Sequence, residues 1–188
     1  MYKVCITEQS AKRQRELELG LLDAMQSRQY EDITVSDLCD MLNIPRKSFY
    51  RYFSSKDGAL FALIDHTMMD FTGEFFSHER AATIDTLEHF FQFWKQQEPL
   101  LTALRRSDLS GILLQRSFIK AAEDDLVARQ LFRTREKHSQ LYVVNFLVSG
   151  LVSLVLQWHG GGFRETPRQL AELATELLTR NLITTPFD

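Results

Sequence analysis

The sequence predicts an all-α protein, in which a small N-terminal helix-turn-helix unit precedes a larger helical part. Apolar residues recur at the helical period along nearly the whole chain and almost nowhere alternate with the period of a strand. Residues that favour helix starts and ends stand at the borders of these apolar stripes. The 188 residues are 44% hydrophobic with only 8 Gly and 4 Pro, so the chain can bury a core and is not intrinsically disordered.

A first helix is expected over about residues 10–29, followed by two short helices. Thr34 is a predicted N-cap, and Asp37 stands at the reciprocal position of a capping box. Asn43 is expected to end this second helix because Asn tolerates the left-handed conformation. Pro45 then opens a third helix that runs to about Tyr52, since a first-turn residue needs no N–H donor.

The rest of the chain is expected to be helical as well. Ser54 or Ser55 caps a fourth helix that is long enough to leave the N-terminal unit and join it to the remainder. Further helices are expected between Ile84 and Pro99, over about 100–106 and 110–122, from about Val127 to His159, and after Thr166, Pro167 and Gln169. Gly160, Gly161 and Gly162 end the longest of them.

The longest helix is apolar over most of its circumference, so it is either central in its own fold or shared with a second chain. We favour sharing, which predicts a homodimer. The candidate interface residues lie on this helix and on the last one: Val144, Val148, Leu151, Val155, Leu173 and Leu177.

Residues 34–60 have the pattern of a helix-turn-helix, in which two short helices join through a tight turn and the second offers its N-terminal residues to the major groove. The segment from Ile44 to Lys56 contains four basic residues and no acidic one. The chain as a whole has a net charge of -3, which excludes a nonspecific nucleic-acid coat. A local basic patch is sufficient to neutralise phosphates.

In this segment the sequence resembles the TetR (tetracycline-repressor) family of bacterial regulators. The motif residues, in order and spacing, are Thr34, Val35, Leu38, Cys39, then Phe49, Tyr50, Tyr52, Phe53, then Ser55, Lys56 and Asp57. The resemblance implies a helix-turn-helix domain over residues 1–55 and a helical effector-binding and dimerisation domain over 56–188. It also implies a transcriptional regulator, a repressor, that binds a palindromic operator as a dimer and is released by a small-molecule effector.

The resemblance implies roles for several residues of the motif. Arg46, Lys47 and Ser48 occupy positions that contact base edges, and Arg or Lys can pair with guanine. Further candidates for contacts to the DNA backbone are Thr34, Ser36, Tyr50, Arg51, Tyr52 and Lys56. The alternatives are that the two tyrosines pack in the small core and that Arg51 is only solvated.

An effector site is inferred from the resemblance and is expected among the aromatic-rich middle helices, for an apolar or aromatic compound. The candidate residues are Phe90, Trp94, Arg105, Phe118 and His138. The alternative is that most of these side chains belong to an ordinary core.

Enzymatic function is not expected. No nucleophile stands on a recognisable signature. The spaced series His66, Asp70, Glu74 and His78 is interpreted as a solvated face, so neither a metal nor a cofactor is predicted.

The chain is expected in the cytoplasm with its two cysteines as free thiols. No membrane segment is expected, because the apolar run from Val143 to Leu156 is short and is interpreted as a buried helix. The competing function is a helical small-molecule-binding or protein-interaction module that has lost DNA binding.

Overall fold

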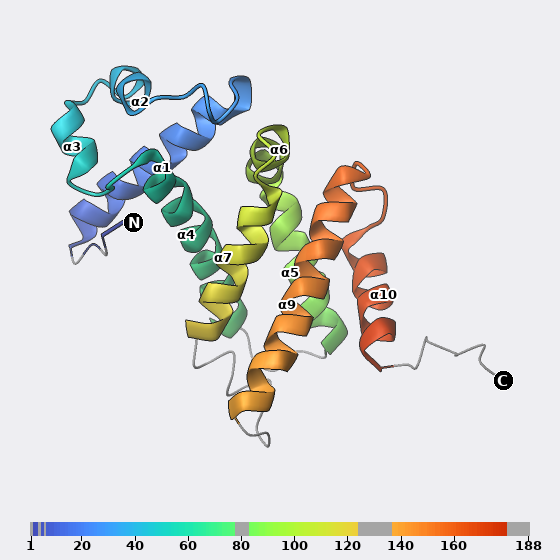
Figure 1. The fold of residues 1–188 in the computed structure, drawn as a ribbon. Helices are drawn as coiled ribbons and strands as arrows, with labels where there is room; N and C mark the ends of the chain where they lie inside the picture. The colour runs from blue at the N-terminus through green and yellow to red at the C-terminus, as the bar shows by residue number, and fades with distance from the viewer. Residues whose placement is uncertain (1, 4, 6, 78–82, 124–136, 180–188) are drawn as a thin grey trace.

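The computed structural model confirms the all-α fold (Figure 1). It describes the chain except for residues 1, 4, 6, 78–82, 124–136 and 180–188, and within helices it leaves out the side chains of 74–77, 122 and 137–140. The described helices are α1 (Glu8–Ser27), α2 (Val35–Met41), α3 (Arg46–Tyr50), α4 (Lys56–Ser77), α5 (Thr83–Gln96), α6 (Glu98–Arg106), α7 (Ser110–Glu123), α9 (Lys137–Gly160) and α10 (Pro167–Thr179).

The predicted local signals around α2 are confirmed. The Thr34 hydroxyl accepts from the Asp37 N–H at 3.1 Å, and the Asp37 carboxylate accepts from the Thr34 N–H at 2.8 Å, which completes the capping box. Asn43 adopts a φ of 51°, the left-handed conformation that ends the helix. Pro45 directly precedes α3, which is two residues shorter than expected.

The signals further along the chain are also confirmed where the structure describes them. The Ser55 hydroxyl accepts from the Gly58 N–H and caps α4. Thr166 and Gln169 form a second reciprocal capping box at the start of α10. Helix α9 ends at Gly160, and Gly162 takes a φ of 79°. The expected start of this helix near Val127 lies outside the described residues.

Helix α4 is the central element of the fold. It packs against α1 on one side and against α7 on the other, and in Figure 1 it leads from the three-helix unit to the remaining helices. Its residues from Ala59 to Asp65 are buried almost all round, with Phe61 as the half-buried exception. The hydrophobic core is therefore continuous from Leu17 in α1 to Ala174 in α10.

Helix α9 differs from the buried helix that we expected. Over Leu141–Gly160 it has a mean hydropathy of 1.8, so by length and composition it could cross a membrane, yet only 22% of its most apolar window is buried within this chain. The expectation of a run too short to span was wrong, because the helix continues beyond Leu156. Its outward side exposes Leu141, Tyr142 and Phe146.

The segment between α1 and α2 is fastened to the start of α4 by Lys56. The Lys56 ammonium donates to the Ile33 carbonyl at 2.6 Å and also to that of Tyr30, and it lies 4.1 Å from the Tyr30 ring centroid. The Tyr30 hydroxyl in turn donates to Asp57 at 2.6 Å, and burial is the main cause that raises the pKa of this phenol. These contacts fix α2 relative to α4.

The capping box predicts an acid-sensitive contribution to stability. Hydrogen bonds from the Thr34 N–H and hydroxyl lower the pKa of Asp37 below its ordinary 3.8. A carboxyl whose pKa is lower in the folded state stabilises the fold fully when the pH is above its ordinary pKa. This stabilisation is lost as the pH falls through the lower pKa of the folded state. We expect Asp37→Asn to be less stable than the wild type at neutral pH, with the gap narrowing below pH 3.8.

Urea unfolding of both proteins across this pH range measures the effect. Asp40→Asn on the same helix is the matched control, because Asp40 takes no part in the box. A stability gap for Asp37→Asn that is independent of pH contradicts the prediction.

Lys56→Met is expected to lower the free energy of unfolding by about 1–3 kcal/mol, because the carbonyls of Tyr30 and Ile33 lose a charged donor. The measurement is urea unfolding followed by circular dichroism. Lys47→Met, at an exposed site on α3, is the control and is expected to leave stability nearly unchanged. Equal stability of the two variants would show that the Lys56 contacts contribute little.

Candidate nucleic-acid interface

Helix α3 has one buried side and one exposed side. Phe49 is fully buried, and its ring lies 5.2 Å from that of Phe53, which attaches the helix to the core. Arg46, Lys47 and Tyr50 are exposed, and Tyr50 shares a helical face with both, since it lies four residues after Arg46 and three after Lys47. The exposed Arg51 follows directly after the helix. The arrangement presents three cations and a phenol to solvent.

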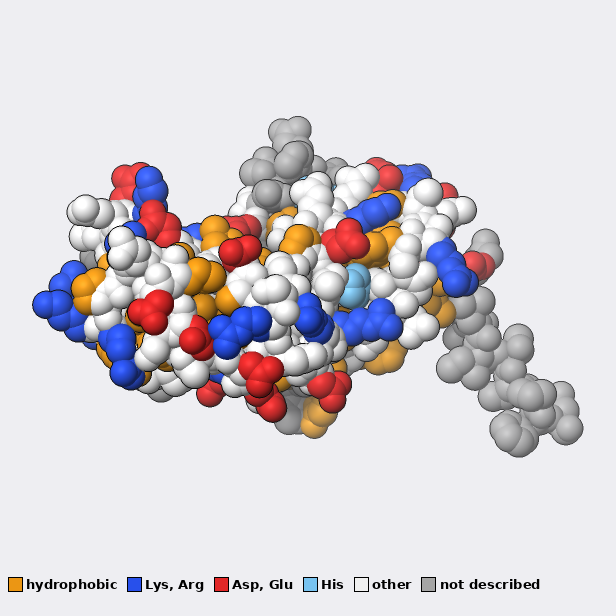
Figure 2. Space-filling model, turned by 90° about the horizontal axis from the view of Figure 1, so that it is seen from above, with side chains coloured by type: hydrophobic (Ala, Val, Ile, Leu, Met, Phe, Trp, Pro, Cys, Tyr) orange, Lys and Arg blue, Asp and Glu red, His pale blue; other side chains and the backbone are white. Residues whose placement is uncertain are grey.

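The exposed side of α3 is positively charged, and no acidic residue stands beside its cations in the sequence. A side-chain hydrogen bond with Tyr50 raises the pKa of Arg46, whose guanidinium is charged throughout the physiological pH range. No acidic residue occurs between Ile44 and Lys56. Figure 2 shows Lys and Arg side chains gathered at the end of the molecule where α3 lies in Figure 1. This face has the chemistry to bind phosphates and guanine edges.

The other predicted contact residues are placed differently. Tyr52 is 8% exposed and packs in the small core, as the alternative interpretation had it. Lys56 is occupied by main-chain carbonyls, and the Thr34 hydroxyl donates to Asp37 at 2.9 Å within the cap. Ser36 and Ser48 are half-buried. The structure thus brings Arg46, Lys47, Tyr50 and Arg51 together at the surface, and all contacts to DNA remain predictions.

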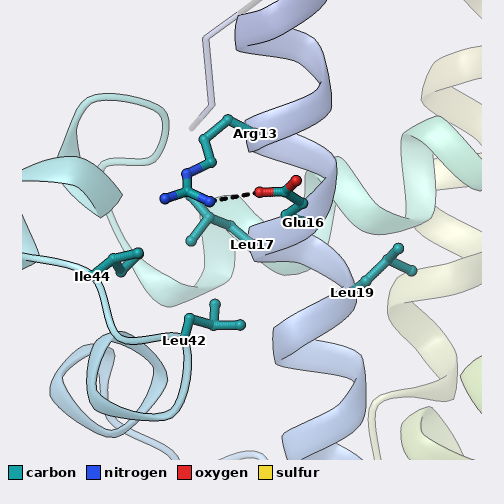
Figure 3. Close-up of a pocket in the computed structure, with 6 residues that line it drawn as sticks. All are labelled: Arg13, Glu16, Leu17, Leu19, Leu42 and Ile44. Carbon is teal, nitrogen blue, oxygen red and sulfur yellow. Dashed lines mark hydrogen bonds and ion pairs between the residues drawn. The ribbon is translucent and has the colours of Figure 1, made fainter.

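A shallow hollow of about 330 Å³ lies beside this unit, between α1 and the turn that leads to α3 (Figure 3). Its floor is apolar, and an exposed Arg13–Glu16 ion pair of 2.7 Å stands at its edge. Gly20 permits the close approach behind it, because a Cβ there would stand 2.8 Å from a methyl carbon of Leu42. The hollow is therefore a gap left where α1 packs against the helix-turn-helix.

The predicted effector residues are only partly brought together. Phe90 and Trp94 lie on α5 with ring centroids 6.4 Å apart. Phe118 is half-buried on α7, whereas Arg105 is exposed and donates to the Gly160 carbonyl at 3.2 Å. The side chain of His138 lies outside the described residues.

Phe90 and Trp94 belong to a cluster of rings that joins α4, α5 and α9. Phe71 lies 5.4 Å from Phe90 and 5.2 Å from Phe93 between ring centroids, and Phe91 lies 6.0 Å from Trp158. The Trp94 indole N–H is buried and has no hydrogen-bond partner among the described residues. A buried donor without a partner is uncommon, so this N–H is a polar position inside an otherwise apolar cluster.

The predicted interface residues on α9 and α10 fall into two groups. Val144 and Val155 are buried within this chain, and Val148 and Leu151 are half-buried. Leu173 and Leu177 on α10 are about half exposed. The most exposed apolar residues of α9, Tyr142 at 66% and Phe146 at 73%, were not predicted from the sequence. Apolar residues occur on all sides of α9, so the sequence pattern did not indicate which side of the helix faces outward.

The candidate metal ligands have other partners. His66 Nδ1 lies 2.9 Å from Glu18, and Asp70 accepts from Arg15 at 3.0 Å. The side chain of Glu74 and the whole of His78 lie outside the described residues. Within the described ranges, no three His, Cys, Asp or Glu side chains gather closely enough to hold a metal ion.

Several solved structures of other proteins share this fold. The structure of Lin0861 from Listeria innocua has a TM-score of 0.74 at 20% identity, covering 94% of both chains. The fatty acid degradation regulator FadR from Bacillus halodurans has a TM-score of 0.61 at 15% identity, covering 89% of this chain and 98% of its own. The TetR family repressor AlkX from Dietzia sp. strain DQ12-45-1b, implicated in biodegradation of n-alkanes, has 0.57 at 18%, covering 86% and 93%.

A search of curated protein sequences finds no match. The TetR family model for the transcriptional regulator C-terminal region matches residues 82–180, more than half of the chain. The match falls on the helical part, and the helix-turn-helix motif resides in the part before it. The chain therefore belongs to the TetR family of transcriptional regulators.

Proposed function

We propose that this regulator binds a palindromic operator as a homodimer, represses transcription there, and is released by a small-molecule effector. The observation that carries the proposal is the exposed side of α3, where Arg46, Lys47, Tyr50 and Arg51 face solvent beside a buried Phe49. A recognition helix needs this division between an anchored and a charged side.

The proposed contacts follow from the exposure of each side chain. Arg46 and Lys47 pair with guanine O6 and N7 in the major groove, and Tyr50 and Arg51 contact phosphates. In the dimer, two such helices enter successive major grooves about 34 Å apart. Residues 1–55 form the DNA-binding domain and 56–188 the effector and dimerisation domain, in the cytoplasm where the DNA is accessible.

A second copy of the chain is proposed to cover the exposed side of α9 and α10. Six large apolar side chains there are more than 40% exposed: Leu141, Tyr142, Phe146, Leu173, Leu177 and Leu178. An apolar face of this kind on a regulator marks an interface, and a two-fold axis places the same face on both partners. The proposal also accounts for the low burial of α9 without a membrane.

The effector is proposed to be an apolar or aromatic compound with one hydrogen-bond acceptor, bound at the ring cluster around Trp94. The unpartnered Trp94 N–H supplies the donor, and Phe90 supplies an aromatic wall. The names of FadR and AlkX, which refer to fatty acid degradation and n-alkanes, favour an apolar compound for this chain as well. The effector acts by binding one conformation of the dimer more tightly than the other.

Lys47→Ala is expected to weaken operator binding by about 1–3 kcal/mol and to relax sequence preference, because one base contact is lost. The measurement is a gel shift with the intergenic DNA upstream of the gene, with a scrambled duplex as competitor, at several salt concentrations.

The matched control for Lys47→Ala is Lys95→Ala, which removes the same charge from an exposed site on α5. It is expected to bind like the wild type. If the wild type itself forms no specific complex at moderate salt, the regulator has lost DNA binding and the competing interaction-module function stands.

Phe146→Glu is expected to convert the dimer to a monomer, because it puts an unpaired charge at the position of the proposed apolar interface whose side chain is 73% exposed. Analytical ultracentrifugation at micromolar protein measures the mass. Met69→Glu, at a site 54% exposed on α4, is the matched control and should remain dimeric. A Phe146→Glu variant that sediments as a dimer places the interface elsewhere.

A further inference from the structure

Tyr2 and Lys3, which precede α1, lie against the residues that follow α3. The Lys3 N–H donates to the Tyr52 carbonyl at 3.0 Å, and Tyr2 forms an isolated antiparallel bridge with Phe53. Tyr52 and Phe53 are buried and directly follow the exposed residues of the recognition helix. The N-terminal segment is therefore tied by its main chain to the residues that hold α3 in place.

The side chain of Tyr2 connects this segment to α4. Its hydroxyl donates to Asp65 Oδ2 at 2.7 Å, and its ring meets His66 edge-on with centroids 5.7 Å apart. Burial is the main cause that raises the pKa of Tyr2, and the hydrogen bond to Asp65 adds to it. The phenol is therefore a permanent donor to Asp65 at any physiological pH.

The same carboxylate is held from the other side by α7. Arg116 Nε donates to Asp65 Oδ1 at 2.7 Å, and its Nη2 donates to Oδ2. Lys120 Nζ lies 3.9 Å from Oδ2, and the Arg116 guanidinium stacks 5.3 Å from the Phe61 ring centroid. Asp65 is fully buried, so its negative charge depends on these donors rather than on water.

We propose that Tyr2, Asp65 and Arg116 form a junction through which a displacement of α7 changes the position of α3. If α7 withdraws Arg116, the Asp65 carboxylate loses both guanidinium bonds and must change its position, because a buried carboxylate cannot stay unpaired. Tyr2 follows Asp65, and the main chain of Tyr2 and Lys3 carries the change to Tyr52 and Phe53. The three are positioning residues, and the consequence for an operator rests on the proposed function.

Hydrogen exchange of single backbone amides, followed by NMR in the full-length protein without DNA, tests the junction directly. In Arg116→Gln the amides of Lys3 and Phe53 are expected to exchange about tenfold faster, because the Lys3 N–H fastens the N-terminal segment to Tyr52 and the Phe53 N–H, which donates to the Phe49 carbonyl at 3.1 Å, closes the end of α3. The Asp37 amide, in the capping box of α2, is expected to keep its rate. Faster exchange confined to α4 and α7, with Lys3 and Phe53 unchanged, overturns the proposal.

The matched control is Arg168→Gln, which removes the same charge from an exposed ion pair with Asp85 and Glu88. It should leave the exchange of Lys3 and Phe53 at the wild-type rate. Acceleration of both amides in this control shows a general loss of stability and also overturns the proposal.

Tyr2→Phe keeps the ring and removes only the hydroxyl, so it serves if Arg116→Gln does not fold. It is expected to speed exchange at Lys3 and, reciprocally, around Arg116 on α7. Unchanged exchange around Arg116 counts against the junction. Operator affinity is measured on the same variant. A wild type that binds no operator, together with coupled exchange, refutes the proposed function and leaves the junction standing.

Discussion

Asp65 places a carboxylate at a fully buried position on α4. The two residues before it in the helix, Leu63 and Ile64, are buried and apolar. A buried charge without partners costs several kcal/mol, so α4 can be buried there only when Arg116 and Tyr2 reach it. The bidentate geometry of a guanidinium on a carboxylate fixes direction as well as distance. The pair therefore sets how α7 lies on α4. Because α9 packs on α7, that orientation extends to the outward apolar face of α9.

The continuous hydrophobic core extends the effect of the Asp65 contacts to other helices. Leu60, Leu63 and Ile64 on α4 belong to the same buried cluster as Leu21 on α1 and Leu113 on α7. Close-packed interiors transmit displacements, because side chains have few alternative arrangements. Arg106 of α6 adds a second link, donating to the Gln26 and Ser27 carbonyls at the end of α1 at 2.7 and 2.9 Å. The three-helix unit is thus held to the rest by polar contacts at the end of α1 and in the middle of α4.

The sequence predicted what depends on neighbours in the chain. Thr34, Asn43 and the Thr166–Gln169 pair act within four residues of themselves, and all three signals are confirmed. The junction could not be predicted, because Asp65 lies 51 residues from Arg116 and 63 from Tyr2. Lys56 shows the same limit. Its motif position implied a phosphate contact, but carbonyls more than 20 residues earlier surround its ammonium. On α9, apolar residues all round concealed which side faces out.

The distribution of charge links the described surface to the proposed contact with DNA. The chain carries a net charge of -3, yet the segment from Ile44 to Lys56 has four basic residues and no acidic one. The Lys56 ammonium donates to main-chain carbonyls within the protein. Arg46, Lys47 and Arg51 are therefore the cations of that segment that face solvent. An acidic body repels a polyanion, whereas a basic tip attracts it. In the proposed function, operator DNA would therefore be steered toward α3 in preference to the helices that carry the proposed effector site.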